Sequence, residues 1–158
     1  MRVILKWSAL GAVAIFAGLQ VVPPPVRPLA QQNPPRGRSL QEIAGHEVGP
    51  ILDRACKDCH SNETTVPWYG NIAPVSWLLA KHVRDGQRKL NFSDWGSRAY
   101  SSNEREEICD AVSNGSMPLR SYTLMHRDAK LSKHDVDSIC NWADSSLTNY
   151  SSQQASPP

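Results

Sequence analysis

Two cysteines and a histidine within five consecutive residues constrain this chain more than any other feature of its sequence. Cys56 and Cys59 are separated by two residues, and His60 follows the second cysteine directly. This is the spacing of c-type haem attachment, in which two thiols add to the two vinyl groups and the adjacent imidazole reaches the iron. We therefore predict one covalently attached haem c whose iron is bound by His60, and a fold that wraps around it.

Other kinds of site also use cysteines at this spacing. A structural zinc site would need a second pair of ligands, but Cys109 and Cys140 lie far apart and neither has a ligand residue beside it. A thioredoxin-like redox pair sits beside a βαβ unit, for which the sequence gives no pattern. A chance match in a loop is the third alternative. The export signal and the amphipathic helix that precede the motif favour haem.

The first 22 residues are predicted to be an export signal. Arg2 and Lys6 precede an apolar run from Trp7 to Val22. As a helix this run spans ~24 Å, close to the ~30 Å of a bilayer core. Because no well-formed cleavage site follows, we predict an uncleaved membrane anchor, with a removed signal peptide as the alternative. Both place the following domain in the periplasm, with the N-terminus of an anchor in the cytoplasm.

Charge is distributed unevenly along the chain. The first 38 residues carry five basic side chains and no acidic one, which leaves 12 basic and 15 acidic side chains for the rest. This remainder is mildly acidic and has no clustered basic face, so nucleic-acid binding is not expected.

The remaining chain divides into three parts. Residues 23–41 are rich in proline and are predicted to form an extended linker. Residues 42–148 are predicted to form one domain, and residues 149–158 a disordered polar tail.

Helical periodicity predicts that this domain is all-α. Apolar residues recur at helical spacing over 48–55, from Pro74 to His82, from 102 or 103 to a stop at Gly115, and from a Ser132–Asp135 capping box to Ala143. No stretch alternates with a period of two. The loops over 61–73 and 89–101 are long, which is expected where a chain wraps a cofactor.

Met117 is the preferred sixth ligand of the iron. It precedes Pro118 in the segment between the last two predicted helices, where single-haem cytochromes usually supply a thioether. Met125, His82 and His126 are the other candidates, and an open or water-bound iron is a further possibility. Met117 is alternatively a core methionine that fills an irregular gap. Methionine ligation raises the haem potential relative to bis-histidine ligation.

Several other side chains are predicted to support the haem. We expect the His60 ring nitrogen that does not bind iron to donate its N–H to the backbone carbonyl of Pro67 or Pro74. Flat apolar surface against the porphyrin is expected from Trp68, Tyr69, Trp77, Phe92 and Trp95. Candidate hydrogen-bond donors to the propionates are Arg84, Arg88, Asn91, Trp95 and Tyr122.

Cys109 and Cys140 fall on the third and fourth predicted helices of the domain. In an oxidising compartment they could form a disulfide that clamps the segment carrying Met117. Two buried free thiols are the equal alternative.

From Cys56 to Trp142 the chain resembles the bacterial haem-binding domain family of small c-type cytochromes. The matching stretches are CKDCHSNET, VPWYGNIAPVSWLL, HVRDGQRKLNFSDW, GSMPLRSYTLMHRDAKLS and ICNWA. The resemblance implies a cytochrome c-like fold, and the family's Met-Pro position falls on Met117-Pro118, which implies Met117 as a ligand. Members typically read glycine-arginine where this chain has Gly86-Gln87-Arg88.

These observations together predict a membrane-tethered, periplasmic electron-transfer cytochrome with His/Met-ligated iron, rather than an enzyme. Its redox partners are not identified by the sequence. A haem-based sensor or gas-binding module, in which Met117 is weak or displaced, is the first alternative. A peroxidase-like activity at an opened iron is the second, with His126 as its only nearby acid or base.

Overall fold

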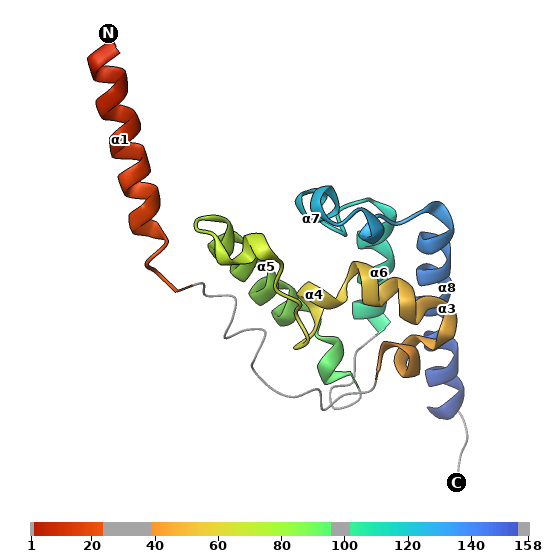
Figure 1. Ribbon diagram of the computed structural model, residues 1–158. Coiled ribbons are helices and arrows are strands. Elements are labelled where there is room, and N and C mark those ends of the chain that lie inside the picture. The colour runs from red at the N-terminus through yellow and green to blue at the C-terminus, as the bar shows by residue number, and fades with distance from the viewer. Residues whose placement is uncertain (1, 24–38, 96–101, 155–158) are drawn as a thin grey trace.

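The computed structural model describes residues 2–23, 39–95 and 102–154 (Figure 1). Every regular element in these ranges is a helix, which confirms the all-α prediction. In chain order the elements are α1 (Arg2–Leu19), α3 (Leu40–Ala55), α4 (Lys57–His60), η1 (Trp68–Asn71), α5 (Val75–Lys89), η2 (Phe92–Asp94), α6 (Ser102–Ser113), α7 (Arg120–Met125), η3 (Arg127–Ala129) and α8 (Lys133–Gln154).

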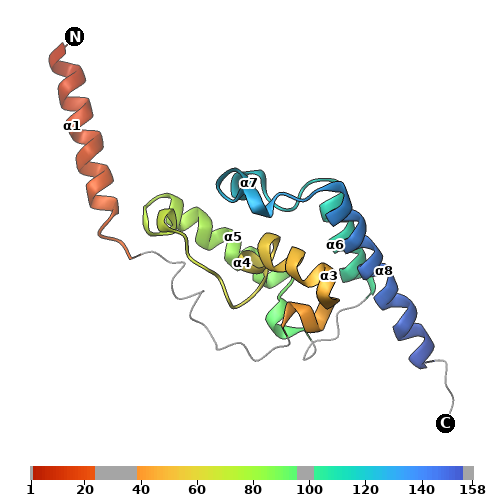
Figure 2. The same cartoon turned by 45° about the vertical axis from the view of Figure 1, so that its right-hand side comes forward.

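Helix α1 extends away from the rest of the chain in both views (Figures 1 and 2). Just beyond its end, the side-chain amide of Gln20 pairs with both backbone groups of Ala73, at 3.1 and 3.2 Å. Among the described residues, no helix combines the length and the hydropathy needed to cross a membrane.

Helix α3 leads the chain into the cysteine motif. Ser39 and Glu42 form a capping box at its start, and Gly45 interrupts it with a φ of 75°. The helix therefore begins inside the segment predicted as linker and well before residue 48. The remaining linker residues 24–38 lie outside the described residues.

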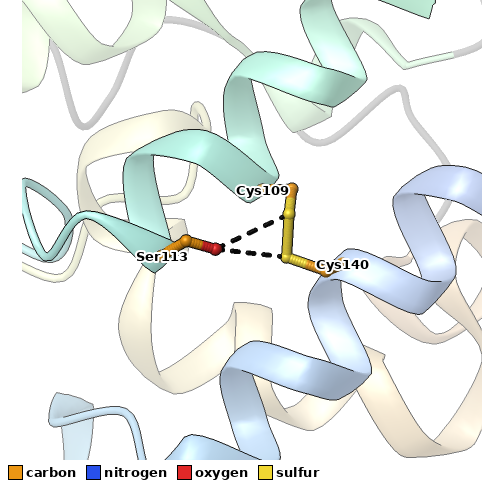
Figure 3. Close-up of a disulfide and its surroundings, with 3 residues drawn as sticks. All are labelled: Cys109, Ser113 and Cys140. Atoms are coloured by element: carbon orange, nitrogen blue, oxygen red, sulfur yellow. Dashed lines mark hydrogen bonds between the residues drawn. A yellow bond between two sulfur atoms is a disulfide. The ribbon is translucent and has the colours of Figure 1, made fainter.

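Helices α3, α6 and α8, together with the short η2, hold the larger of two apolar clusters. Its buried members are Leu40, Ala44, Val48, Ile51, Leu52, Phe92, Val112 and Ile139. A disulfide between Cys109 and Cys140 joins α6 to α8, so the bridged alternative is confirmed (Figure 3). The Ser113 hydroxyl lies 3.7 Å from Cys109 Sγ and 3.5 Å from Cys140 Sγ. The smaller cluster consists of Ala80 and Val83 on α5, packed against Cys59, Val66 and Leu79.

The predicted end of α6 and the predicted start of α8 are both found. Gly115, with a φ of 72°, follows the end of α6. Ser132 and Asp135 form the predicted capping box before α8, because each accepts the backbone N–H of the other. However, α8 continues to Gln154, so the chain is helical where the disordered tail was predicted to begin at residue 149. Each added turn of a helix that is already packed needs no new nucleus, which allows this extension.

Candidate functional site

The cysteine motif lies at a sharp turn between α3 and α4. The backbone N–H groups of Cys59 and His60 both donate to the Cys56 carbonyl, at 3.2 and 2.9 Å. This turn keeps the two thiols close to His60 on one short segment. Cys56 and Cys59 are half-buried free thiols, so both are available for attachment.

The His60 ring is oriented by a backbone carbonyl. Its Nδ1 lies 3.1 Å from the carbonyl oxygen of Leu90, the residue that follows α5. The predicted backbone carbonyl partner is therefore present, but it belongs to Leu90 and not to Pro67 or Pro74 as expected. Their carbonyls accept local backbone N–H groups, from Gly70 and Trp77 respectively. With Nδ1 engaged, Nε2 is the nitrogen left to bind a metal.

Burial sets the protonation of this segment. It raises the pKa of the Cys56 thiol to about 12 and the pKa of the Cys59 thiol to about 11. It also lowers the pKa of His60, and this effect exceeds the opposing effect of the hydrogen bond to Leu90. The imidazole is therefore neutral at pH 7, which is the form that ligates iron.

Three adjoining pockets surround the motif. One of about 770 Å³ is lined by Cys59, His60, His82, Gly86, Lys89, Met117 and Tyr122. A second is lined by Cys56, His60 and Met117 together with residues of α6, and a third by Cys59, Tyr69, Leu78, Tyr122 and Met125. Together these pockets border both thiols and the His60 ring, so a ligand in them would contact all three groups.

Met117 lines the two pockets that His60 also lines. Its backbone N–H donates to the Ala111 carbonyl at 3.0 Å, which ties it to the end of α6. Of the other candidate ligands, His82 lines two of the pockets and Met125 one. The His126 ring instead contacts two tyrosines: its Nε2 lies 2.7 Å from the Tyr69 hydroxyl, and its ring stacks on Tyr122.

The predicted aromatic residues fall into two groups. Tyr69, Phe92 and Tyr122 line the pockets. Trp68 and Trp95 are not among the lining residues. Trp68 is 70% exposed and meets the Tyr69 ring edge-on, and Trp95 packs between Phe92 and Trp142 beside the larger apolar cluster.

Two of the predicted propionate donors, one on α5 and one just before η2, have other contacts. Arg88 pairs with Asp85 at 2.7 Å, and the buried Asn91 donates to the Asn62 side chain at 2.9 Å. The basic side chain that does line the pockets is Lys89, in the last turn of α5. Its place beside His60 depends on how α5 packs against α4, and the sequence pattern alone did not single it out.

Asp58 and Gly86 are two further site residues that the sequence analysis missed. Asp58 lies between the cysteines, where the motif demands no particular residue, and accepts hydrogen bonds from the Thr65 backbone and the Tyr122 hydroxyl. Gly86 lies against the backbone of Cys59. Both contacts join segments that are distant in sequence, so no local pattern signals them.

The family model of the haem-binding domain matches residues 14–145, which is most of the chain and includes every residue of the site described above. No curated protein and no solved structure matches the chain. The matched span is long enough to show the family, and it agrees with a site of two thiols, a neutral imidazole and a set of adjoining pockets. The chain belongs to the haem-binding domain family.

Proposed function

We propose that this protein binds one haem c covalently through Cys56 and Cys59, and that it carries electrons in the periplasm with His60 and Met117 as axial ligands. The observation that carries this proposal is the shared position of His60 and Met117. The two residues line the same two pockets, and His60 has its Nδ1 engaged so that Nε2 is free for iron.

The residues present fit a covalent haem. The two free thiols, Cys56 and Cys59, lie just before His60 in the sequence. Each lines a pocket that His60 also lines. Burial keeps His60 neutral, as a ligand must be. The bound haem would supply an iron that cycles between the ferrous and ferric states. The apolar walls from α5 and α6 would exclude water from the haem, and Lys89 would supply a positive charge in the same pockets.

Electron transfer is the function that fits this ligand set best. An iron held by both His60 and Met117 would have no vacant site for a substrate, so outer-sphere electron transfer would be its natural role. The side chains that tune the potential are then Met117, through its sulfur, and His60, through its hydrogen bond to Leu90.

The choice of Met117 is tested by spectroscopy of matched methionine variants. The ferric wild-type protein should show the weak far-red sulfur-to-iron band. Met117→Ala should abolish it, while Met125→Ala, which alters the neighbouring pocket, should preserve it. Two results would contradict the electron-carrier proposal: ready carbon monoxide binding by the ferrous wild-type protein at neutral pH, or a ferric wild-type spectrum without the band. Either result would favour a sensor or a peroxidase with an open iron.

Covalent attachment is tested separately by extraction of haem into acidified organic solvent. The double variant Cys56→Ala/Cys59→Ala should release all its haem. Cys109→Ser/Cys140→Ser is the control, because it also removes two cysteines but should retain the haem. Covalent haem in the first variant would contradict attachment at this motif.

We also propose that residues 1–22 export the domain and tether it to the membrane. The basic residues before the apolar run support this proposal. Resistance of the full-length protein to alkaline carbonate extraction of membranes would distinguish an anchor from a removed signal peptide.

A further inference from the structure

Asp58 connects the haem-attachment segment to the segment that carries Met117. Its Oδ1 accepts the Thr65 backbone N–H at 3.0 Å, and its Oδ2 accepts the Tyr122 hydroxyl at 2.8 Å. Tyr122 lies on α7, the short helix that begins three residues after Met117. One carboxylate therefore joins α4 directly to α7.

Tyr122 is itself held by a second pair of rings. Its ring stacks on His126, with centroids 4.3 Å apart and an interplanar angle of 13°. His126 Nε2 lies 2.7 Å from the hydroxyl of Tyr69 in η1. Asp58, Tyr69, Tyr122 and His126 thus form one connected group, which we call the tyrosine cluster, and its two tyrosines line the pocket beside Cys59.

The Met117 segment is fixed at both of its ends. At its start, the Met117 backbone N–H and the Ser116 hydroxyl both donate to the Ala111 carbonyl of α6. At its end, the chain enters α7, and the Tyr122 backbone N–H donates to the Leu119 carbonyl at 2.9 Å. The α6 contacts alone would let the segment pivot about Ala111. The bond from α7 to Asp58 supplies the second point of attachment.

We propose that the hydrogen bond from Tyr122 to Asp58 is a latch that holds Met117 in place as the sixth ligand, so that both are positioning residues for the iron. This inference rests on the proposed His/Met ligation. It assigns a specific role to residue 58, a position that the haem-attachment motif itself leaves open.

The chemistry of the pair suits a latch. Burial raises the pKa of the Tyr122 hydroxyl above its usual value, and the hydrogen bond to Asp58 raises it further. The hydroxyl therefore keeps its proton and continues to donate. A hydrogen bond to a charged acceptor is among the stronger ones in proteins.

The test uses Tyr122→Phe, which removes only the hydroxyl and keeps the ring that stacks on His126. Imidazole titrated into the ferric protein competes with Met117, so its apparent affinity reports how firmly Met117 is bound. Loss of a hydrogen bond to a charged group should tighten imidazole binding ~10- to ~100-fold. The far-red band should weaken and the haem potential should fall in the same variant. Thr123→Ala, on the same helix, removes a hydroxyl that donates to the Arg120 carbonyl within α7, and it should leave all three unchanged.

A double-mutant cycle with Asp58→Ala assigns any effect to the bond itself. If the latch exists, the double variant should bind imidazole less tightly than the two single effects together predict. The latch alone would be overturned if Tyr122→Phe kept the far-red band at its wild-type intensity. It would also be overturned if the effects of the two substitutions on imidazole affinity were strictly additive. A wild-type protein with no far-red band would overturn the His/Met ligation and the latch with it.

Discussion

At the scale of single residues, Gly86 controls how closely α5 approaches the cysteine motif. A Cβ built at this position would lie 2.4 Å from the Cys59 carbonyl oxygen and 3.0 Å from its carbonyl carbon. These are backbone atoms of the motif, so they cannot move without displacing His60. The same approach places Leu90, just beyond α5, where its carbonyl accepts from His60.

Gly86→Ala should therefore disturb the site as well as the fold. We expect it to lower the free energy of unfolding by roughly 1–3 kcal/mol, as overpacking does, and to reduce the fraction of protein that carries covalent haem. Urea denaturation and the ratio of haem absorbance to protein measure the two effects. Gly18→Ala is the control, because a Cβ there meets nothing within 4 Å. Equal stability and haem content in Gly86→Ala and the wild type would contradict the close contact.

The residues proposed to carry the chemistry stand out in the sequence at this scale, but their partners do not. Cys56, Cys59 and His60 are identified by spacing alone, because attachment is a local reaction. The Leu90 carbonyl that is bonded to His60 and the Tyr122 hydroxyl that is bonded to Asp58 lie 30 and 64 residues away in sequence. They depend on how α4, α5 and α7 pack, and no local pattern encodes that packing.

At the scale of elements, the helices with an amphipathic face and recognisable caps were the ones that could be predicted. The starts of α5, α6 and α8 agree with the sequence analysis because proline, serine and the capping box mark them. Helix α7 was missed: it is only six residues long, and none of its residues is fully buried. Its position is defined instead by the side chains of Tyr122 and His126.

Asp135 gives α8 a pH-dependent start. Burial alone would raise the pKa of this carboxyl, but hydrogen bonds from Ser132 and the Arg54 guanidinium outweigh burial and hold it below its usual value. A carboxyl with a lowered folded-state pKa stabilises the fold above its unfolded-state pKa of about 3.9. This contribution is lost as the pH falls through the folded-state pKa.

Asp135→Asn should therefore destabilise the protein by about 1–2 kcal/mol at pH 7, from a weakened cap and a lost ion pair to Arg54. The difference from the wild type should shrink at the lowest pH at which the protein stays folded, because the wild-type carboxyl gains its proton as the pH falls through its lowered folded-state pKa. Urea midpoints at the two pH values measure it. Asp137→Asn, in an exposed pair with Lys133, should change little at either pH. A difference that is the same at both pH values would refute the role of the charge.

At the scale of the whole molecule, the two apolar clusters are unequal and the pockets lie beside both. The larger cluster belongs to α3, α6 and α8 and is reinforced by the disulfide. The smaller one has only two buried residues, Ala80 and Val83 on α5. Pocket walls come from α5 on one side and from the end of α6 and the Met117 segment on the other. A haem in these pockets would complete the core around α5, where the protein itself supplies few buried apolar side chains. Helical periodicity predicts single helices but carries no information about contacts that a cofactor makes between them.

This inequality predicts which part of the molecule depends on haem. In the haem-free variant Cys56→Ala/Cys59→Ala, backbone amides of α5 should exchange with deuterium at least ~10-fold faster than in the haem-loaded wild type, which corresponds to about 1.4 kcal/mol of local stability. Amides of α8 up to residue 144 should keep most of their protection, because the disulfide and the larger cluster do not require the cofactor. Mass spectrometry of peptides from the two helices measures the difference. Met117→Ala, which keeps its covalent haem, should retain protection in α5 and so separates the effect of the cofactor from that of a substitution at the site. Equal loss of protection in α5 and α8 would mean that the molecule unfolds as one unit, and that haem supports all of it rather than one side.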